Sequence, residues 1–390
     1  MDKKHSMCAT ALATLALVNT AAAQTTATQQ LLAQIQPAPN AAPESNLATR
    51  PEAGGVGPSA PGTLPASASK PPPLLEVYGL LDAFLTSGHY GKGTVTSLDS
   101  SGSRATRFGL RGGRDVNSQL TVEYNLEAGF NLDQGSYPDN TRIFNRQSYV
   151  GMKSQYGTFR FGRMNTMQFV MLGKYDAMDA TTQASPLLNL APFAPRYGNV
   201  LAYISPKLAG AVTLQAQYGL GEASDGSHKN NNWHLSAEYE KGPIGAGVTH
   251  EEIKDATGLI TTKYTLAGGS YDFGAFRLFG GYHVAKVSDN SRNARTWTLS
   301  GLYRLTKQDW FSLAYGKVDD HTPANNDASQ AGFLYQHFFD ATTVVYFALS
   351  RIDNTNNAKF TLNGAAVAGT PVYYPGADPK AVQLGFRYSF

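Results

Sequence analysis

The sequence predicts an all-β protein, a membrane-spanning antiparallel up-and-down β-barrel of about 16 strands over residues 74–390. Three observations predict this fold: alternating apolar and polar residues at the C-terminus, further segments with the same alternation, and connections that are alternately long and short. Beyond residue 23, no stretch approaches the ~18 apolar residues of a membrane helix. A mean hydropathy of -0.29 fits transmembrane strands, which intersperse lipid-facing side chains with polar ones.

The N-terminal residues 1–23 have the pattern of a signal peptide. Two lysines precede the apolar run Ala9–Val18, and Ala21–Ala23 forms a cleavage site. The only cysteine, Cys8, lies before the apolar run, which argues against a lipid anchor and leaves the mature chain without disulfides. Residues 24–73 are rich in Ala, Pro, Ser, Thr and Gln, which predicts a disordered periplasmic tether. The alternative is that this segment contacts peptidoglycan or a partner.

The last ten residues show the alternation most clearly. Val382, Leu384, Phe386, Tyr388 and Phe390 share one parity, and Gln, Gly, Arg and Ser occupy the other. Such a strand presents one face to lipid and the other to water. A chain that ends on a strand leaves an exposed edge unless its sheet closes on itself, so this segment indicates a barrel.

About sixteen segments from Leu74 onward have period-two alternation. The clearest lie at 122–130, 212–220, 233–239 and 297–305. The 21 tyrosines and 19 phenylalanines suit the aromatic girdles of a barrel. A barrel of this width encloses water, whereas about eight strands would be filled by side chains.

The connections carry a second signal, because short links such as SQYG, EKGP and DFG separate long ones. An up-and-down barrel with long outer loops predicts this order, and a Greek-key sandwich does not. The predicted long connections are Ser87–Ser103, Asn131–Asn145, Asn165–Pro195, Gly221–Asn231, Asp255–Thr262, Ser288–Ala294, Asp319–Ala328 and Asp353–Lys380.

Six strings, in order along the chain, resemble the general bacterial outer-membrane porins. They are VYGLLDA (77–83), TRFGLRG (106–112), LEAGFN (126–131), FNRQSYVG (144–151), YGTFRFGR (156–163) and GFRYSF (385–390). The resemblance implies a homotrimeric diffusion channel in the outer membrane, in contact with lipid and lipopolysaccharide, whose third long loop, Asn165–Pro195, folds into the lumen as a constriction. It also implies insertion by the barrel-assembly machinery through the C-terminal strand ending in Phe390.

In that family, wall arginines face acids on the inward loop, and the resemblance places Arg107 and Arg146 on the wall. Parity supports both, because Arg107 alternates with Phe108, and Arg146 shares a face with Ser148. The family often carries arginine just before its Tyr-x-Ser-Pro string. This chain has Ala202 there, and Arg196, of the same parity, is the candidate substitute.

Two further arginines, Arg104 and Arg111, are open to either interpretation, as constriction residues or as solvated lumen or rim residues. The third loop offers two acids, Asp176 and Asp179. Glu127 is predicted to face the lumen, together with Asp82 and Glu123. Because few loop acids oppose several arginines, the sequence predicts weak selectivity with a modest preference for anions.

Other functional classes find little support. A net charge of +3 is too small to indicate nucleic-acid binding. No Gly-x-Ser-x-Gly or His-Glu-x-x-His motif is present, so we expect neither an enzyme nor a bound cofactor. The acidic stretches at 319–327 and 353–357 lack EF-hand spacing and are interpreted as solvated loop tips, with a contact to a divalent cation or lipopolysaccharide as the alternative. The alternative function is an outer-membrane anchor or adhesin with a closed barrel and a functional tether, which an apolar, sealing third loop would favour.

Overall fold

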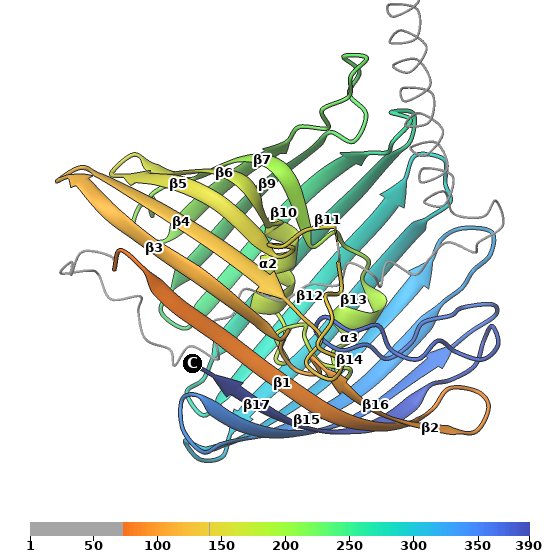
Figure 1. Ribbon diagram of the computed structural model, residues 1–390. Helices are drawn as coiled ribbons and strands as arrows, with labels where there is room; N and C mark the ends of the chain where they lie inside the picture. Colours follow the sequence, from red (N-terminus) through yellow and green to blue (C-terminus); the bar gives the residue numbers. More distant parts are fainter. Residues whose placement is uncertain (1–72, 140) are drawn as a thin grey trace, which may run out of the picture. The chain divides into compact units, whose positions relative to one another are not determined.

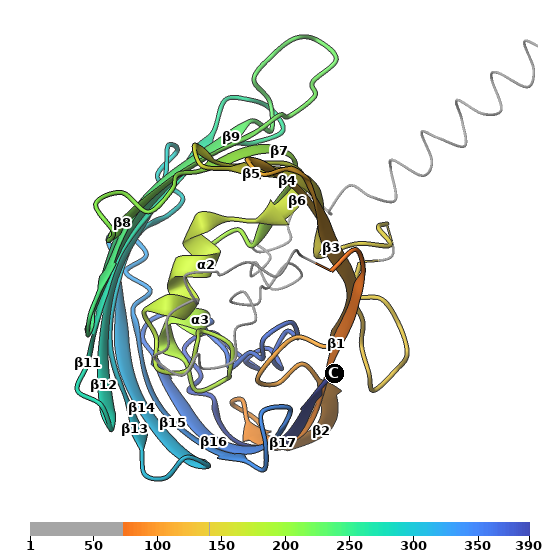
Figure 2. The same ribbon diagram turned by 90° about the vertical axis from the view of Figure 1, so that its left-hand side faces the viewer.

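The computed structural model describes residues 73–139 and 141–390, which belong to one compact unit, Asn46–Phe390. The predicted signal peptide, and all of the predicted tether except Pro73, lie outside the described residues. Seventeen strand segments form one antiparallel sheet that closes on itself (Figures 1 and 2). The segments are β1 (Glu76–His89), β2 (Thr94–Ser100), β3 (Arg107–Asn117), β4 (Leu120–Gly129), β5 (Gln147–Ser154), β6 (Gly157–Asn165), β7 (Arg196–Ile204), β8 (Val212–Gly219), β9 (Asn232–Lys241), β10 (Ile244–Lys254), β11 (Thr261–Asp272), β12 (Phe276–Val287), β13 (Asn293–Arg304), β14 (Asp309–Asp320), β15 (Ala328–Phe338), β16 (Thr343–Asn354) and β17 (Lys380–Ser389).

The segments β2 and β3 occupy a single position in the barrel. The first half of β1 pairs with β3, and its second half pairs with β2. The chain leaves the sheet between them, over residues 101–106. Since β17 pairs with both β1 and β16, the sheet closes as a sixteen-stranded antiparallel barrel with one interrupted strand. This confirms the predicted fold class.

The alternation along each strand separates an outward face from an inward one. In β17 the apolar side chains Val382, Leu384, Phe386 and Tyr388 are 41–52% exposed, whereas Arg387, of the other parity, is buried. The same holds in β13, where Leu299 is exposed and Ser300 is buried. The lipid-facing parity predicted from the sequence is therefore confirmed.

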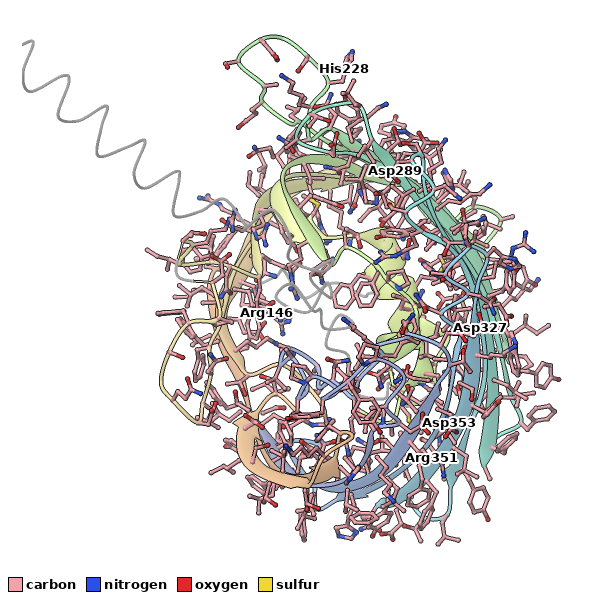
Figure 3. All side chains as sticks on the ribbon, turned by 90° about the vertical axis from the view of Figure 1, so that its right-hand side faces the viewer. Arg146, His228, Asp289, Asp327, Arg351 and Asp353 are labelled. Atoms are coloured by element: carbon pink, nitrogen blue, oxygen red, sulfur yellow. The ribbon has the colours of Figure 1, made fainter. Side chains whose placement is uncertain are left out.

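Long and short connections alternate as predicted, with one exception. The expected long loop Ser87–Ser103 is wrong, because β1 continues to His89, a turn covers residues 90–93, and β2 returns along β1. The sequence Thr94–Ser100 contains Thr94, Val95 and Thr96, β-branched residues that favour a strand. The remaining long connections begin and end at one mouth of the barrel, because consecutive strands are antiparallel. Figure 3 shows His228, Asp289, Asp327 and Asp353 around the ring.

Two helices in the connection 166–195 lie inside the ring of strands, α2 (Met167–Lys174) and α3 (Pro186–Leu190) (Figure 2). The side chain of Thr166 accepts from the Phe169 N–H at the start of α2, and Ser185 caps α3 in the same way. Within the described residues, no helix is long and apolar enough to cross a membrane.

The helices pack on the inner wall, α2 against β10 and β11 and α3 against β13–β15. Leu172, Leu187 and Leu188 form a buried cluster with Leu266 of β11. Burying such side chains stabilises the segment by roughly 1.5–3 kcal/mol each, as an upper estimate. The segment 166–195 is thus held against the wall and does not hang as an open loop.

Candidate pore-lining site

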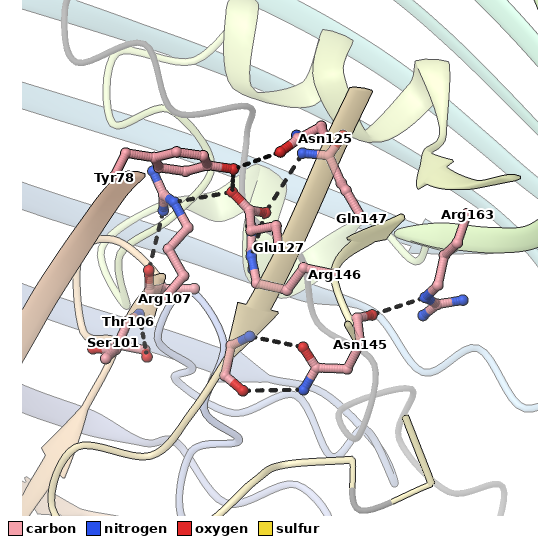
Figure 4. A network of polar contacts seen from close by, with 12 residues as sticks. Tyr78, Ser101, Thr106, Arg107, Asn125, Glu127, Asn145, Arg146, Gln147 and Arg163 are labelled. Atoms are coloured by element: carbon pink, nitrogen blue, oxygen red, sulfur yellow. Dashed lines mark hydrogen bonds and ion pairs between the residues drawn. The ribbon is translucent and has the colours of Figure 1, made fainter. Parts of the chain in front are cut away.

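Glu127 binds two arginines inside the barrel (Figure 4). Its Oε1 lies 2.7 Å from Arg146 Nε, and its Oε2 lies 3.3 Å from Arg107 Nε. The hydroxyl of Tyr78 donates a further hydrogen bond to Oε2 at 2.9 Å. All three charged side chains are at most 8% exposed. One carboxylate therefore contacts two guanidinium groups.

Local structure brings these groups together. Arg107 is the first residue of β3, directly after the interruption, and pairs with Gly129 on β4. Arg146 precedes β5, and its backbone N–H donates to the Glu127 carbonyl at 3.2 Å. Its side chain packs against Gly129 on the inner face of the barrel. A Cβ added at Gly129 would lie 2.9 Å from Arg146 Cδ, which is too close. A glycine at this position gives the guanidinium its route to Glu127.

The parity argument for Arg146 is wrong. Gln147 pairs with Glu127, and Ser148 pairs with Leu126, so Ser148 lies on the lipid face of β5. Arg146 reaches the lumen because it precedes the strand, where alternation does not apply. The parity of Arg107 is as predicted, since Gly109 of the same face pairs with Glu127.

The two acids of the segment 166–195 differ in their surroundings. Asp179 forms an ion pair with Arg104, whose Nη1 also contacts the Thr181 hydroxyl at 3.4 Å. Asp176 is buried and accepts hydrogen bonds from Ser185 Oγ (2.6 Å), from the Ala180 N–H (2.8 Å) and from Ser300 Oγ (3.2 Å). Burial raises the pKa of the Asp176 carboxyl above its usual value. Asp179 thus faces an arginine, while Asp176 fastens the segment to β13.

The other two arginines, Arg196 and Arg111, make different contacts. The guanidinium of Arg196 lies over the Phe169 ring, 5.5 Å from its centroid. A β-bulge between β6 and β7 breaks the parity assumed between Arg196 and Ala202, because Met164 pairs with Tyr197 while Gly162 pairs with Val200. Arg111 makes two bonds to Glu76, at 2.5 and 3.0 Å, and is half exposed.

Two cavities are bordered by these lumen-facing side chains. The larger, of about 720 Å³, is bordered by Arg107 and Glu127, and the smaller, of about 360 Å³, by Arg146. Both have more basic than acidic side chains. The larger has Arg104, Arg107, Arg111, Lys307 and Arg387 against Glu127 and Asp340, and the smaller has Arg146, Arg163 and Arg196 against Asp139.

Sequence analysis did not single out Arg163, Lys307 or Arg387 as pore-lining residues. The signal for Arg387 was present, because it lies on the polar parity of the last strand. The other two predicted lumen acids also have partners. Glu123 forms an ion pair with Arg160, with Oε1 2.7 Å from Nε. Asp82 accepts hydrogen bonds from the backbone between β2 and β3. Among residues 73–139 and 141–390, no cluster of three or more His, Cys, Asp or Glu is arranged to hold a metal ion.

A family model described as Gram-negative porin matches residues 10–357. The chain belongs to the Gram-negative porin family. This porin is 26% identical over 313 residues to outer membrane porin protein 32 of Delftia acidovorans, a match that covers 75% of this chain and 87% of that one. It is also 27% identical over 208 residues to an outer membrane porin protein of Bordetella pertussis, covering 47% of this chain and only 52%, about half, of that relative.

Solved structures share the fold. An anion-selective porin from Comamonas acidovorans superposes with a TM-score of 0.72 at 21% identity, covering 81% of this porin and 99% of that chain. The trimer form of OmpT from Vibrio cholerae gives a TM-score of 0.61 at 16% identity, covering 82% and 100%. With its family and its closed barrel, the protein is an outer-membrane porin, a family of channels and not of enzymes.

Proposed function

We propose that this porin is a passive channel for ions and small hydrophilic solutes, with a modest preference for anions. The observation that carries the proposal is the excess of basic over acidic side chains among the described residues that border both cavities. A positive potential attracts anions within a screening length of about 8–10 Å at physiological salt, so a solute passing these side chains lies within its reach.

The segment 166–195 narrows the lumen in this proposal. Its helices pack on β10, β11 and β13–β15, and Asp179 forms an ion pair with Arg104, which lies between β2 and β3. Arg107 and Arg146 set the local field with Glu127, and Arg196 adds positive charge in the smaller cavity. Arg111 lines the larger cavity, and Asp176 fixes the segment in place.

A homotrimer is the proposed assembly, in keeping with the trimer form of OmpT. The exposed apolar faces of strands such as β17 would contact lipid, with lipopolysaccharide as a partner at the outer leaflet. The strand ending in Phe390 would be the part that the barrel-assembly machinery contacts, and it is fixed by reciprocal backbone bonds between Phe390 and Gly79.

Planar-bilayer recording tests the channel and its charge preference together. We expect stable conductance steps, in groups of three for a trimer, and a reversal potential in a salt gradient whose sign shows anion preference. A clear cation preference would overturn the assignment of selectivity. A folded barrel that inserts but never conducts would overturn the channel, and would favour the anchor or adhesin function instead.

A further inference from the structure

Asp82 of β1 is fully buried, and its carboxylate accepts four hydrogen bonds. The backbone N–H groups of Gly102, Ser103 and Arg104 donate to it at 3.0, 3.1 and 2.9 Å. The Tyr346 hydroxyl of β16 donates the fourth at 2.7 Å. Three consecutive N–H groups thus converge on one carboxylate, an arrangement of backbone dipoles that favours a negative charge.

Residues 101–106, which we call the clamp segment, are closed at their base by a second set of bonds. Ser101 donates its N–H to the Asp82 carbonyl at 2.9 Å and adopts a left-handed φ of 70°. Thr106 donates its N–H to Ser101 Oγ at 2.9 Å, and its own hydroxyl accepts from the Asp82 N–H at 3.1 Å. The clamp segment is therefore a loop whose conformation is fixed by hydrogen bonds to β1.

The clamp segment contacts both long connections that enter the barrel. Arg104 forms an ion pair with Asp179 of the segment 166–195. The Ser101 carbonyl accepts from the Ala365 N–H, in the connection between β16 and β17, at 2.7 Å. From the wall, Arg387 donates to Ser103 Oγ at 2.7 Å. Displacing the clamp segment would disturb all three contacts.

We propose that the clamp segment is a second constriction element, and that Asp82 is the positioning residue that holds it and Arg104 in the lumen. An uninterrupted strand would place these residues in the wall, as β2 and β3 are placed. The backbone instead turns inward and carries the Arg104 charge to the segment 166–195 (Figure 2). The effect on solutes rests on the proposed channel function, whereas the positioning itself does not.

An ionised carboxylate suits this site because it offers only acceptors. In Asp82→Asn, one oxygen becomes an NH₂ group that would face N–H donors and lose their bonds. Hydrogen bonds to a charged group are among the stronger ones in proteins, so their loss should raise the population of the displaced clamp segment by about tenfold or more.

Thiol labelling of Ala105, which is 1% exposed, reports on the position of the clamp segment. In a Cys8→Ser background, we expect Ala105→Cys to react slowly with a charged, water-soluble thiol reagent. Adding Asp82→Asn should accelerate the reaction by about tenfold or more. Adding Glu123→Gln is the matched control, since it also removes one lumen carboxylate, and it should leave the labelling rate unchanged.

A second, milder variant keeps the test valid if Asp82→Asn does not fold. Tyr346→Phe removes only one of the four donors to Asp82 and should accelerate labelling by less than Asp82→Asn. Single-channel conductance should rise in Asp82→Asn above the Glu123→Gln value, because the lumen widens. Equal labelling rates in folded Asp82→Asn, Tyr346→Phe and Glu123→Gln proteins would overturn the proposal. Faster labelling in a barrel that never conducts would uphold the positioning role while overturning the channel.

Discussion

Arg146 and Glu127 form a buried ion pair across β4 and the start of β5, with Nε 2.7 Å from Oε1 and both side chains at most 6% exposed. Arg107 binds the other oxygen of the same carboxylate. Breaking a buried pair leaves an uncompensated charge, which is more costly than losing an exposed pair. Glu127 therefore lowers the positive potential that both guanidinium groups present to solutes.

Replacing Glu127 by Gln should strengthen the anion preference. The amide oxygen can still accept from one arginine, its NH₂ group faces the other, and neither guanidinium is neutralised. The reversal potential in a salt gradient measures the change. Glu76→Gln is the control, since Glu76 pairs with the half-exposed Arg111, and we expect a smaller shift from it. A shift toward cations in Glu127→Gln would contradict the assigned roles.

Replacing Arg107 or Arg146 by Gln should have the opposite effect and weaken the anion preference. Each change removes one buried positive charge from the border of a cavity, Arg107 from the larger and Arg146 from the smaller. Arg351→Gln removes the same charge from β16, where the side chain is 61% exposed and pairs with Asp353, and salt screens it more effectively. If all three variants shift the reversal potential equally, proximity to Glu127 does not matter.

Arg104 and Asp179 should be energetically coupled. In a double-mutant cycle with Arg104→Gln and Asp179→Asn, we expect a coupling free energy of about 0.5–1.5 kcal/mol, modest because Asp179 is 37% exposed. Unfolding titrations of the four proteins in lipid vesicles give this value. Arg160→Gln paired with Asp179→Asn is the control cycle and should show additive effects. A coupling near zero in the first cycle would show that the ion pair does not hold the segment 166–195.

Asp176 should make the stability of the barrel depend on pH. Burial raises the pKa of its carboxyl in the folded protein, so the folded state binds the proton more tightly than the unfolded state. Its stabilising contribution is present below the unfolded pKa and is lost as the pH rises through the folded pKa. Unfolding free energies should show wild type losing stability relative to Asp176→Asn as the pH rises from about 4 to 7. Parallel pH profiles for the two proteins would contradict this expectation.

Gly332 of β15 should not tolerate a side chain. A Cβ there would overlap the carbonyl oxygen of Ala184 in the segment 166–195. We expect Gly332→Ala to destabilise the folded barrel by about 1–3 kcal/mol and to alter single-channel conductance. Gly280→Ala is the matched control, because its nearest neighbour, the Thr298 carbonyl oxygen, lies 3.9 Å from the added atom. Equal stability and conductance in both variants would show that the segment does not press on the wall.

The barrel was predictable because lipid and water impose alternation on each strand, as Phe386 and Arg387 show. The partners of the charged groups were not predictable from the sequence, because they depend on how the irregular segments fold. The inward turn at residues 101–106 relies on Asp82, which lies about twenty residues earlier in the chain. Sequence alternation also fails where a strand begins, as at Arg146, and where a bulge intervenes, as between Arg196 and Ala202.

The glycines on the inner wall determine how much of the lumen the segment 166–195 leaves open. At Gly268 an added Cβ would overlap the Tyr175 ring, so the wall is recessed where the segment rests on it. The free cross-section is therefore encoded partly in the strands and partly in the segment. In a relative with the same inward loop sequence but bulkier wall residues, the loop would be displaced. The size limit for solutes would then differ, although the charged groups that select solutes by charge would be unchanged.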